Sequence, residues 1–317
     1  MLRWLVIGIG DITSKRVLPA ILAEPRSVLT GIVTRDPAKA EPYNVPGWAD
    51  LTRALAECPC DAVYVASPVF LHAPQTIAAL RAGKHVLCEK PMALDYTEAV
   101  SMQRAAVETG LTLGVAYYRR LYPKVARARE LMASGAIGRP VFVEATSHGW
   151  TDFADGFRAW ISDPKKSGGG PLKDVASHRI DLMNYLFGKP VCVSGHMSKL
   201  VQPITVEDNA TVLIEYENGV RGMVDVRWHS RVARDEFRIR GTEGEIELSP
   251  LNAPQLVQPQ GTENIPNHPN LHYPCIEDFV SAIAESRAPA SSGTTALPAE
   301  WVMQQAQHPV SRTTQSR

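Results

Sequence analysis

The chain has 317 residues, of which 44% are hydrophobic and 21% are charged. This length favours two domains over one, and the composition is ordinary for a globular protein. Lysine plus arginine equals aspartate plus glutamate at 33 each, so the formal net charge is zero. This balance argues against a nucleic-acid or membrane-surface role that depends on charge.

Neither a membrane span nor a disulfide framework is predicted. No apolar run reaches the length that crosses a bilayer. The five cysteines are irregularly spaced, and Cys58-Pro59-Cys60 has neither the redox spacing nor that of a usual zinc half-site. Reduced thiols in a cytoplasmic protein are the simplest interpretation.

The first predicted element is an apolar strand over residues 2–7, followed by a glycine turn. Glycines at this point let the backbone approach a pyrophosphate, and a helix over residues 15–23 would offer its N-terminus to that anion. The usual third glycine is replaced by threonine. The turn predicts contacts between a dinucleotide and Gly8, Gly10, Asp11, Ile12 and Thr13.

The second strand, over residues 28–33, ends in Thr34-Arg35, with Asp36 set further on. An NAD enzyme places an acidic residue at this point to bind both ribose hydroxyls. A hydroxyl next to a guanidinium suits a 2′-phosphate instead, so NADP is preferred over NAD. The alternative is that Arg35 stacks on the adenine or lies in solvent.

Helices and short strands then alternate as far as residue 116, which predicts a parallel doubly wound sheet. One strand ends in Ser67-Pro68 and is followed by His72, which is either a hydrogen-bonded loop histidine or a residue near the cofactor. The next strand ends in Glu89-Lys90-Pro91. Ligands bind at this edge of an open sheet, and Pro91 restricts the backbone of Lys90. The alternative for Lys90 is a salt-bridged loop residue.

Beyond residue 140 the pattern changes to strands of alternating polarity, with a hairpin turn at Asn218-Gly219. These strands predict a largely antiparallel sheet with one apolar face to be covered. Its polar face is either solvated or a subunit contact. From Pro289 onward Pro, Ser, Thr and Gln dominate, which predicts a loosely packed tail.

Between these strands, three glycines and Pro171 predict the start of a helix. On a regular helix Asp174, His178 and Asp181 project from one face. A carboxylate beside an imidazole suits deprotonation of an alcohol. The alternatives are helix capping by Asp174 and a surface pair of His178 with Asp181. No third ligand at a usual spacing completes a zinc site, so no metal is predicted.

The order of these motifs resembles the glucose–fructose oxidoreductase and inositol dehydrogenase (Gfo/Idh/MocA) family. The matching segments span most of the chain, to about residue 290, and each keeps its place in the family's order. They are Gly8-Ile9-Gly10, Ser67 to His72, Gly83 to Val86, Glu89-Lys90-Pro91, and Gly168-Gly169-Gly170 with Asp174 and His178.

The resemblance implies a Rossmann domain over residues 1–118 and a mixed α/β domain over residues 119–317, with the active site between them. Lys90 and His178 would be the catalytic pair, and Asp174 would orient the substrate. Glu89 would contact the cofactor near the nicotinamide ribose, and the Lys90–Pro91 bond would be cis. Further cofactor and substrate contacts are expected at Ser67, Pro68, His72, Arg119 and Trp160.

The expected reaction is hydride transfer between nicotinamide and a secondary alcohol or carbonyl of a sugar, polyol or related molecule. The alternatives are a dihydrodiol or imine substrate, or an NADP-sensing protein without activity. A homodimer or homotetramer through the C-terminal sheet is also expected. The family pattern is broken at four places: Tyr118 replaces asparagine, Ile161 replaces arginine, Pro171 follows the triple glycine, and polar residues after Gln307 replace an alanine-rich helix.

Overall fold

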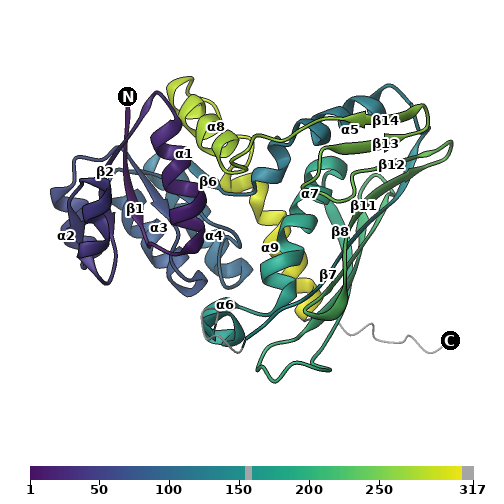
Figure 1. The fold of residues 1–317 in the computed structure, drawn as a ribbon, viewed down its shortest axis with the longest axis horizontal. Helices are drawn as coiled ribbons and strands as arrows, with labels where there is room; N and C mark the ends of the chain where they lie inside the picture. The colour runs from purple at the N-terminus through teal and green to yellow at the C-terminus, as the bar shows by residue number, and fades with distance from the viewer. Residues whose placement is uncertain (154–158, 309–317) are drawn as a thin grey trace. The chain divides into compact units, whose positions relative to one another are not determined.

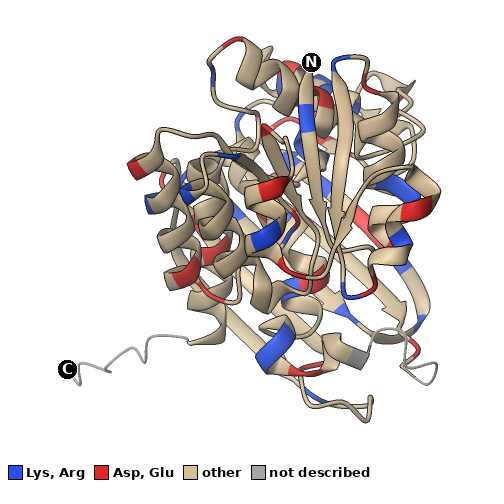
Figure 2. Cartoon of the chain, turned by 90° about the vertical axis from the view of Figure 1, so that its left-hand side faces the viewer, with Lys and Arg blue, Asp and Glu red and all other residues tan. Residues whose placement is uncertain are grey.

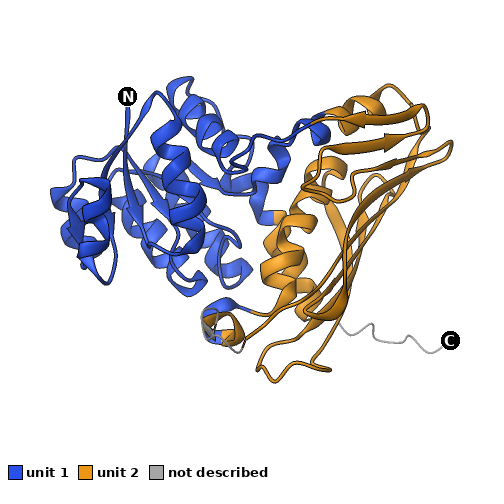
Figure 3. Ribbon diagram, viewed as in Figure 1, with its two compact units in different colours: residues 1–126, 165–168, 266–297 blue, residues 127–164, 169–265, 298–317 orange. Residues whose placement is uncertain are grey.

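The structure of the protein is a computed structural model that describes residues 1–153 and 159–308 (Figure 1). Its contacts divide the chain into two compact units (Figure 3). The first contains residues 1–126, 165–168 and 266–297, and the second contains residues 127–164, 169–265 and those from 298 on. Residues 266–297 therefore pack with the first unit, although a single cut at residue 118 assigns them to the second.

The first unit is built on a six-stranded sheet in the order β3-β2-β1-β4-β5-β6. Every neighbouring pair is parallel, so the predicted doubly wound sheet is confirmed. The central strand β4 is fully buried, and the last four residues of β1 are buried too, as continuous apolar runs in parallel sheets usually are. The strands are β1 (Leu2–Ile7), β2 (Ser27–Val33), β3 (Gly47–Trp48), β4 (Ala62–Val65), β5 (His85–Cys88) and β6 (Leu113–Val115).

Helices of the first unit cover this sheet. One of them, α8 (Tyr273–Ala284), comes from late in the sequence and lies beside α1. Its Phe279 ring packs 5.5 Å from the ring of Trp4, centroid to centroid. The other helices before residue 123 are η1 (Thr13–Val17), α1 (Leu18–Ala23), η2 (Pro37–Tyr43), α2 (Leu51–Glu57), η3 (Val69–Leu71), α3 (His72–Arg81), α4 (Tyr96–Thr109) and η4 (Tyr118–Leu121).

The second unit contains an eight-stranded sheet in the order β14-β13-β12-β11-β7-β10-β9-β8. Only β7 and β10 run parallel among its paired strands, so the predicted, largely antiparallel sheet is confirmed. The strands are β7 (Pro140–Trp150), β8 (Pro190–Ser198), β9 (Asn209–Tyr216), β10 (Arg221–Arg227), β11 (His229–Gly241), β12 (Glu245–Glu247), β13 (Gln255–Gln258) and β14 (Gly261–Asn264).

Two helices cover the apolar face of this second sheet. In α7 (Ser177–Phe187), Phe187 packs 5.9 Å from Tyr216 of β9, and the Tyr216 hydroxyl donates to the Asn184 amide oxygen at 3.0 Å. In α9 (Gly293–Gln307), Ala306 lies against Gly195 of β8 so closely that a Cβ there would be 2.7 Å away. The remaining helices are α5 (Pro123–Ala133), η5 (Ala159–Ser162), α6 (Pro164–Ser167) and η6 (Leu172–Ala176).

The prediction of a loosely packed tail from Pro289 is wrong as far as residue 308. The helix α9 begins at Gly293, and Ala296, Ala299, Val302, Met303 and Ala306 are buried along it. These small and apolar residues recur at helical spacing, which outweighs the polar residues between them. The polar residues noted after Gln307 fall mainly on residues 309–317, outside the described residues.

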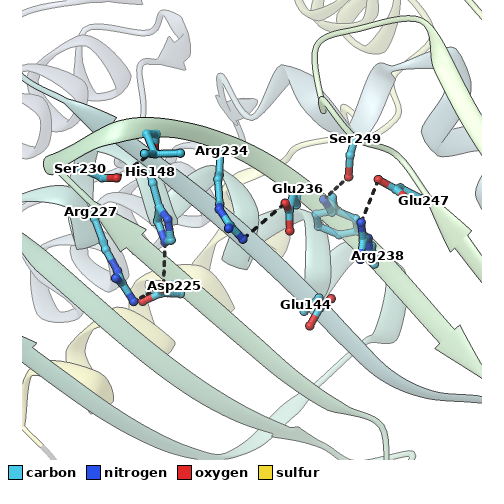
Figure 4. A network of polar contacts seen from close by, with 12 residues as sticks. Glu144, His148, Asp225, Arg227, Ser230, Arg234, Glu236, Arg238, Glu247 and Ser249 are labelled. Atoms are coloured by element: carbon cyan, nitrogen blue, oxygen red, sulfur yellow. Dashed lines mark hydrogen bonds and ion pairs between the residues drawn. The ribbon is translucent and has the colours of Figure 1, made fainter.

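The other face of the second sheet carries a polar network (Figure 4). His148 Nε2 lies 2.7 Å from the Asp225 carboxylate, which Arg227 also contacts at 3.0 Å. Arg238 of β11 pairs with Glu247, which lies opposite it on β12, at 3.3 Å. Over the described residues, Figure 2 shows acidic and basic segments interspersed, in keeping with the equal counts of the two charges. No helix in this part of the chain is long and apolar enough to span a bilayer.

Candidate active site

The predicted cofactor residues follow the carboxyl ends of adjacent parallel strands in the first unit. Gly8 to Thr13 follow β1, Thr34 and Arg35 follow β2, and Ser67 to His72 follow β4. Glu89 and Lys90 follow β5, and Arg119 follows β6. Because these strands are parallel, all five segments lie at one edge of the sheet, where ligands bind in open α/β folds.

The two glycines of the first turn serve different purposes. Gly8 has a φ of +91°, and a Cβ there would lie 2.7 Å from the carbonyl oxygen of Ala66, so only glycine fits. A Cβ on Gly10 would meet nothing within 4 Å. The open space beside Gly10 fits the close approach of a pyrophosphate.

The helix after the turn begins with irregular geometry. Its first full turn, η1, is π-helical, and Thr13, which replaces the third glycine, is completely buried within it. Ile12 is exposed, and the Asp11 carboxylate forms an ion pair with Lys15 at 2.5 Å. The ion pair offsets the negative charge that Asp11 would otherwise present to a phosphate.

The residues after β2 differ in exposure and in their hydrogen bonds. The Thr34 backbone N–H donates to the Trp48 carbonyl at 2.8 Å, while Arg35 is exposed. The Asp36 carboxylate accepts the Ala38 N–H at 3.3 Å and so caps η2. Asp36 is therefore engaged by its own helix.

His72 is a buried, hydrogen-bonded histidine, which was one of its two predicted roles. Its Nδ1 lies 2.9 Å from the carbonyl oxygen of Pro91, and its Nε2 lies 2.8 Å from that of Ser67. The Ser67 hydroxyl donates to Gln75 at 2.6 Å, and Pro68 precedes η3 as its N-cap. His72 thus joins the loop after β4 to the loop after β5.

Glu89 is a buried carboxylate with three donors in the first unit. Tyr64 donates to its Oε1 at 2.7 Å, His272 Nε2 lies 3.2 Å from the same oxygen, and the Lys90 N–H donates to Oε2 at 3.2 Å. Burial raises the pKa of Glu89, but the hydrogen bond and charge of His272, with Tyr64 and Lys90, outweigh it and lower the pKa to about 2. Glu89 is therefore ionised at neutral pH.

Lys90 is half-buried directly beside this network, and the predicted cis Lys90–Pro91 bond is present. Arg119 is only 8% exposed, and its Nε and Nη1 have no hydrogen-bond partner among the described residues. Arg120 differs, because its guanidinium donates to the carbonyl oxygens of Ala290 and Thr295. Arg120 therefore holds the first turn of α9 and the chain just before it.

The candidate acid–base residues lie in the second unit. The glycines before them pack tightly, since a Cβ on Gly170 would collide with the Glu207 carbonyl oxygen. The Glu207 carboxylate accepts the Leu172 N–H at 3.3 Å, and burial raises its pKa. Asp174 is half-buried and His178 is 5% exposed.

The helix that carries these residues is not regular, contrary to the prediction. Residues Leu172–Ala176 form the π-helical η6, and the α-helix α7 starts only at Ser177. Asp174 lies within the π-turn and His178 within the following α-helix, so one regular α-helical period does not run through both residues. Such turns occur often at functional sites.

Two further contacts fix this segment of the second unit. The Lys173 ammonium is paired with Glu300 of α9 at 2.9 Å, and both side chains are almost fully buried. Trp160 packs with Val175 against an apolar cluster that includes Ile161 and Trp228. Ile161, which stands where the family has arginine, is therefore a core residue.

Sequence reasoning missed Tyr64 and His272. Tyr64 lies within an apolar strand, where an aromatic residue is expected to pack in the core. His272 is 183 residues away from Glu89 in the sequence, and no local pattern links the two. Among the described residues, no group of three or more His, Cys, Asp and Glu side chains is arranged to hold a metal ion.

Comparison with known proteins gives a consistent match over both units. The family model described as "Oxidoreductase family, NAD-binding Rossmann fold" matches residues 2–117. The model described as "GFO/IDH/MocA C-terminal domain" matches residues 125–247.

Individual relatives match over most of their length. The chain is 29% identical over 308 residues to 1,5-anhydro-D-fructose reductase of Ensifer adhaerens, covering 92% of this chain and 91% of the relative. It is 31% identical over 286 residues to dTDP-3,4-didehydro-2,6-dideoxy-alpha-D-glucose 3-reductase of Streptomyces violaceoruber, covering 84% and 81%. The crystal structure of an oxidoreductase from Thermotoga maritima matches with a TM-score of 0.88 at 26% identity, covering 97% and 96% of the two chains.

Proposed function

The chain belongs to the Gfo/Idh/MocA family of NAD(P)-binding oxidoreductases, and from that premise we propose that it interconverts a secondary alcohol and a carbonyl of a sugar or polyol. The observation that carries this proposal is the grouping of a glycine turn, a half-buried lysine and a buried arginine at one edge of the parallel sheet. In the second unit, Asp174 and His178 are carried by η6 and α7, and we propose these two side chains as the acid–base groups.

Each of these side chains has a distinct proposed role. The residues that follow β1, β2, β4 and β5 would hold the nicotinamide cofactor, whose chemistry when bound would be to accept or donate a hydride at the substrate carbon. His178 takes the hydroxyl proton during oxidation and returns it during reduction, because an imidazole exchanges protons near neutral pH. Lys90 donates a hydrogen bond to the same oxygen and offsets its developing negative charge. Asp174 orients the substrate hydroxyl.

The substrate class is inferred from the relatives and from Arg119. The two relatives above are named as reductases of an anhydrosugar and of a nucleotide-linked sugar. Arg119 is buried with two N–H groups that have no partner among the described residues, and such donors are costly to leave unused. An oxygen-rich substrate would supply the missing acceptors. Trp160 is proposed to contact the same substrate.

We further propose that NADP is preferred over NAD. The exposed guanidinium of Arg35 follows β2, and the nearby Asp36 carboxylate is engaged as a helix cap. Replacing Arg35 by alanine should weaken NADPH binding about 10- to 100-fold, the range expected for a charge-assisted hydrogen bond, and leave NADH binding unchanged. Fluorescence titration of both nucleotides measures this, and a strong NAD preference in the parent would contradict the proposal.

The reaction itself is tested by following reduced nicotinamide absorbance with polyols, aldoses, keto-sugars, anhydrosugars and dihydrodiols. On any substrate that the parent turns over, Lys90→Met and His178→Asn should each lower kcat at least 100-fold, within the range of general acid–base contributions. If both variants keep near-parental turnover while binding cofactor normally, the assigned roles are wrong.

We also propose that the chain forms a homodimer or homotetramer through the polar face of the second sheet. This face carries the network around His148 and Asp225, and Leu213 on β9 is 51% exposed. Replacing Leu213 by aspartate should lower the mass measured by analytical ultracentrifugation, and an unchanged mass would contradict this interface. A cytoplasmic location is proposed because all five cysteines are free thiols.

A further inference from the structure

We propose that His272 is a positioning residue for Lys90, and that it acts through the carboxylate of Glu89. The proposal rests on the proposed function only for the catalytic role of Lys90, because the contacts themselves lie within the first unit. His272 precedes α8, and its Nε2 lies 3.2 Å from Glu89 Oε1.

The two oxygens of Glu89 perform separate tasks. Oε1 is held by the Tyr64 hydroxyl at 2.7 Å and by His272. Oε2 accepts the backbone N–H of Lys90 at 3.2 Å. The donors on Oε1 therefore set the direction of the carboxylate, and the carboxylate then fixes the backbone from which the Lys90 side chain departs.

Burial makes this arrangement sensitive to the loss of a donor. Glu89 is 7% exposed and His272 is 3% exposed, so water does not readily replace a missing hydrogen bond. A buried carboxylate that loses a donor either rotates or takes up a proton. Both outcomes weaken the acceptor for the Lys90 N–H.

His272 is itself held by the helix that follows the glycine turn. The Asn270 side-chain amide donates to the Arg16 carbonyl at 2.8 Å, and the Arg16 guanidinium donates to the Pro269 carbonyl at 3.2 Å. Asn270 Oδ1 in turn accepts the His272 N–H at 3.1 Å. The segment over residues 269–272 thus connects the pyrophosphate-binding helix with Glu89.

A second histidine, His72, contacts the backbone that follows Lys90. The carbonyl oxygen of Pro91 lies 2.9 Å from His72 Nδ1, which fixes the backbone just after the lysine. The Tyr118 ring packs 4.5 Å from the His272 ring and limits its rotation. Two buried histidines from distant parts of the chain therefore hold the backbone before and after Lys90.

The test measures hydrogen exchange of the Lys90 backbone amide in the full-length protein, with no substrate required. His272→Leu removes the donor, His272→Gln keeps an N–H at the Nε2 position, and His196→Ala, at an exposed histidine of the second unit, is a control. The Glu89 amide donates to the Val65 carbonyl at 2.8 Å and serves as the internal reference.

In His272→Leu, Lys90 amide protection should fall about tenfold, the factor that corresponds to one hydrogen bond to a charged acceptor. Glu89 amide protection should stay unchanged, and both the glutamine variant and the His196→Ala control should resemble the parent. If His272 had a purely structural role, the protection of the Lys90 and Glu89 amides would fall together. Unchanged Lys90 protection in the leucine variant, or equal loss in the leucine and glutamine variants, overturns the proposal.

A kinetic readout follows on any substrate that the parent turns over. In His272→Leu, kcat should fall on the order of tenfold with little change in KM, and His272→Gln should restore it.

The groups that face Glu89 are Tyr64, His272 and Lys90, with Cys88 and Cys275 nearby. A new acid limb in the kcat profile of the leucine variant is expected, because Glu89 then takes up a proton at higher pH.

The two readouts separate this proposal from the proposed function. If the leucine variant does not fold, Glu89→Gln tests the same step, because it keeps the shape of the side chain but weakens the acceptor for the Lys90 N–H. Full Lys90 protection in Glu89→Gln overturns the proposal. A protein that turns over no alcohol but shows the predicted exchange pattern would contradict the proposed function alone.

Discussion

Replacing Glu300 by leucine should cost far more stability than a surface substitution, because it leaves a buried lysine without its counterion. Lys173 is 1% exposed, Glu300 is 0% exposed, and their charged atoms are 2.9 Å apart. Breaking a buried ion pair by removing one partner typically costs about 3–5 kcal/mol. With a urea slope of about 3 kcal/mol per molar, the unfolding midpoint should fall by at least about 1 M.

The double variant Lys173→Met with Glu300→Leu separates lost charge compensation from lost packing. Apolar residues of similar volume often replace a buried ion pair at little cost, so the double variant should recover most of the stability. Lys173 precedes Asp174 in η6, so turnover should fall in the single variant and return in the double variant.

Equilibrium urea unfolding, followed by circular dichroism, measures the four members of this cycle. The expected interaction energy is on the order of 3 kcal/mol. A cost below about 1 kcal/mol for Glu300→Leu, which is the range of exposed ion pairs, would refute the reasoning. The reasoning would also be refuted if the double variant lost as much free energy of unfolding as the two single variants lose together.

Other predictions concern the nucleotide side. Gly8→Ala should lower the melting temperature, because its Cβ would lie 2.7 Å from the Ala66 oxygen at a φ of +91°, whereas Gly10→Ala should melt like the parent yet bind NADPH more weakly in fluorescence titrations. Equal melting temperatures for the two variants would contradict this. The folded pKa of Glu89, about 2, lies below the ordinary 4.5, so its ionised form stabilises the fold above pH 4.5 and this contribution is lost as pH falls towards 2. When urea unfolding is measured between pH 4.5 and 2, the free energy of unfolding should fall less with pH in Glu89→Gln than in the parent. An equal fall in both proteins would show that Glu89 is not the cause.

The parallel sheet and its ligand-binding edge could be predicted because their signals are local. An apolar run followed by Gly8 and Gly10, or by Glu89 and Lys90, identifies the end of a strand without any tertiary information. The hairpin at Asn218-Gly219 was predictable for the same reason. The features that could not be predicted from the sequence include contacts between distant segments.

The contacts of His272 illustrate that limit. Its partner Glu89 is 183 residues away, and its segment follows a complete sheet of the second unit. The error over α9 has another cause, since alanines at positions 296, 299 and 306 pack closely but give a weak hydrophobic signal. The π-turn of η6 carries no recognisable sequence pattern, and so the expectation of a regular helix from Pro171 onward missed it.

The return of residues 266–297 to the first unit has a consequence for biosynthesis. The Trp4 side of the N-terminal core is covered by Phe279 and its neighbours in α8, which leave the ribosome only after the whole second sheet. A nascent chain of 265 residues therefore carries an apolar surface that its own later segment will cover. During translation this surface is available to chaperones, and premature termination before α8 would leave an aggregation-prone product.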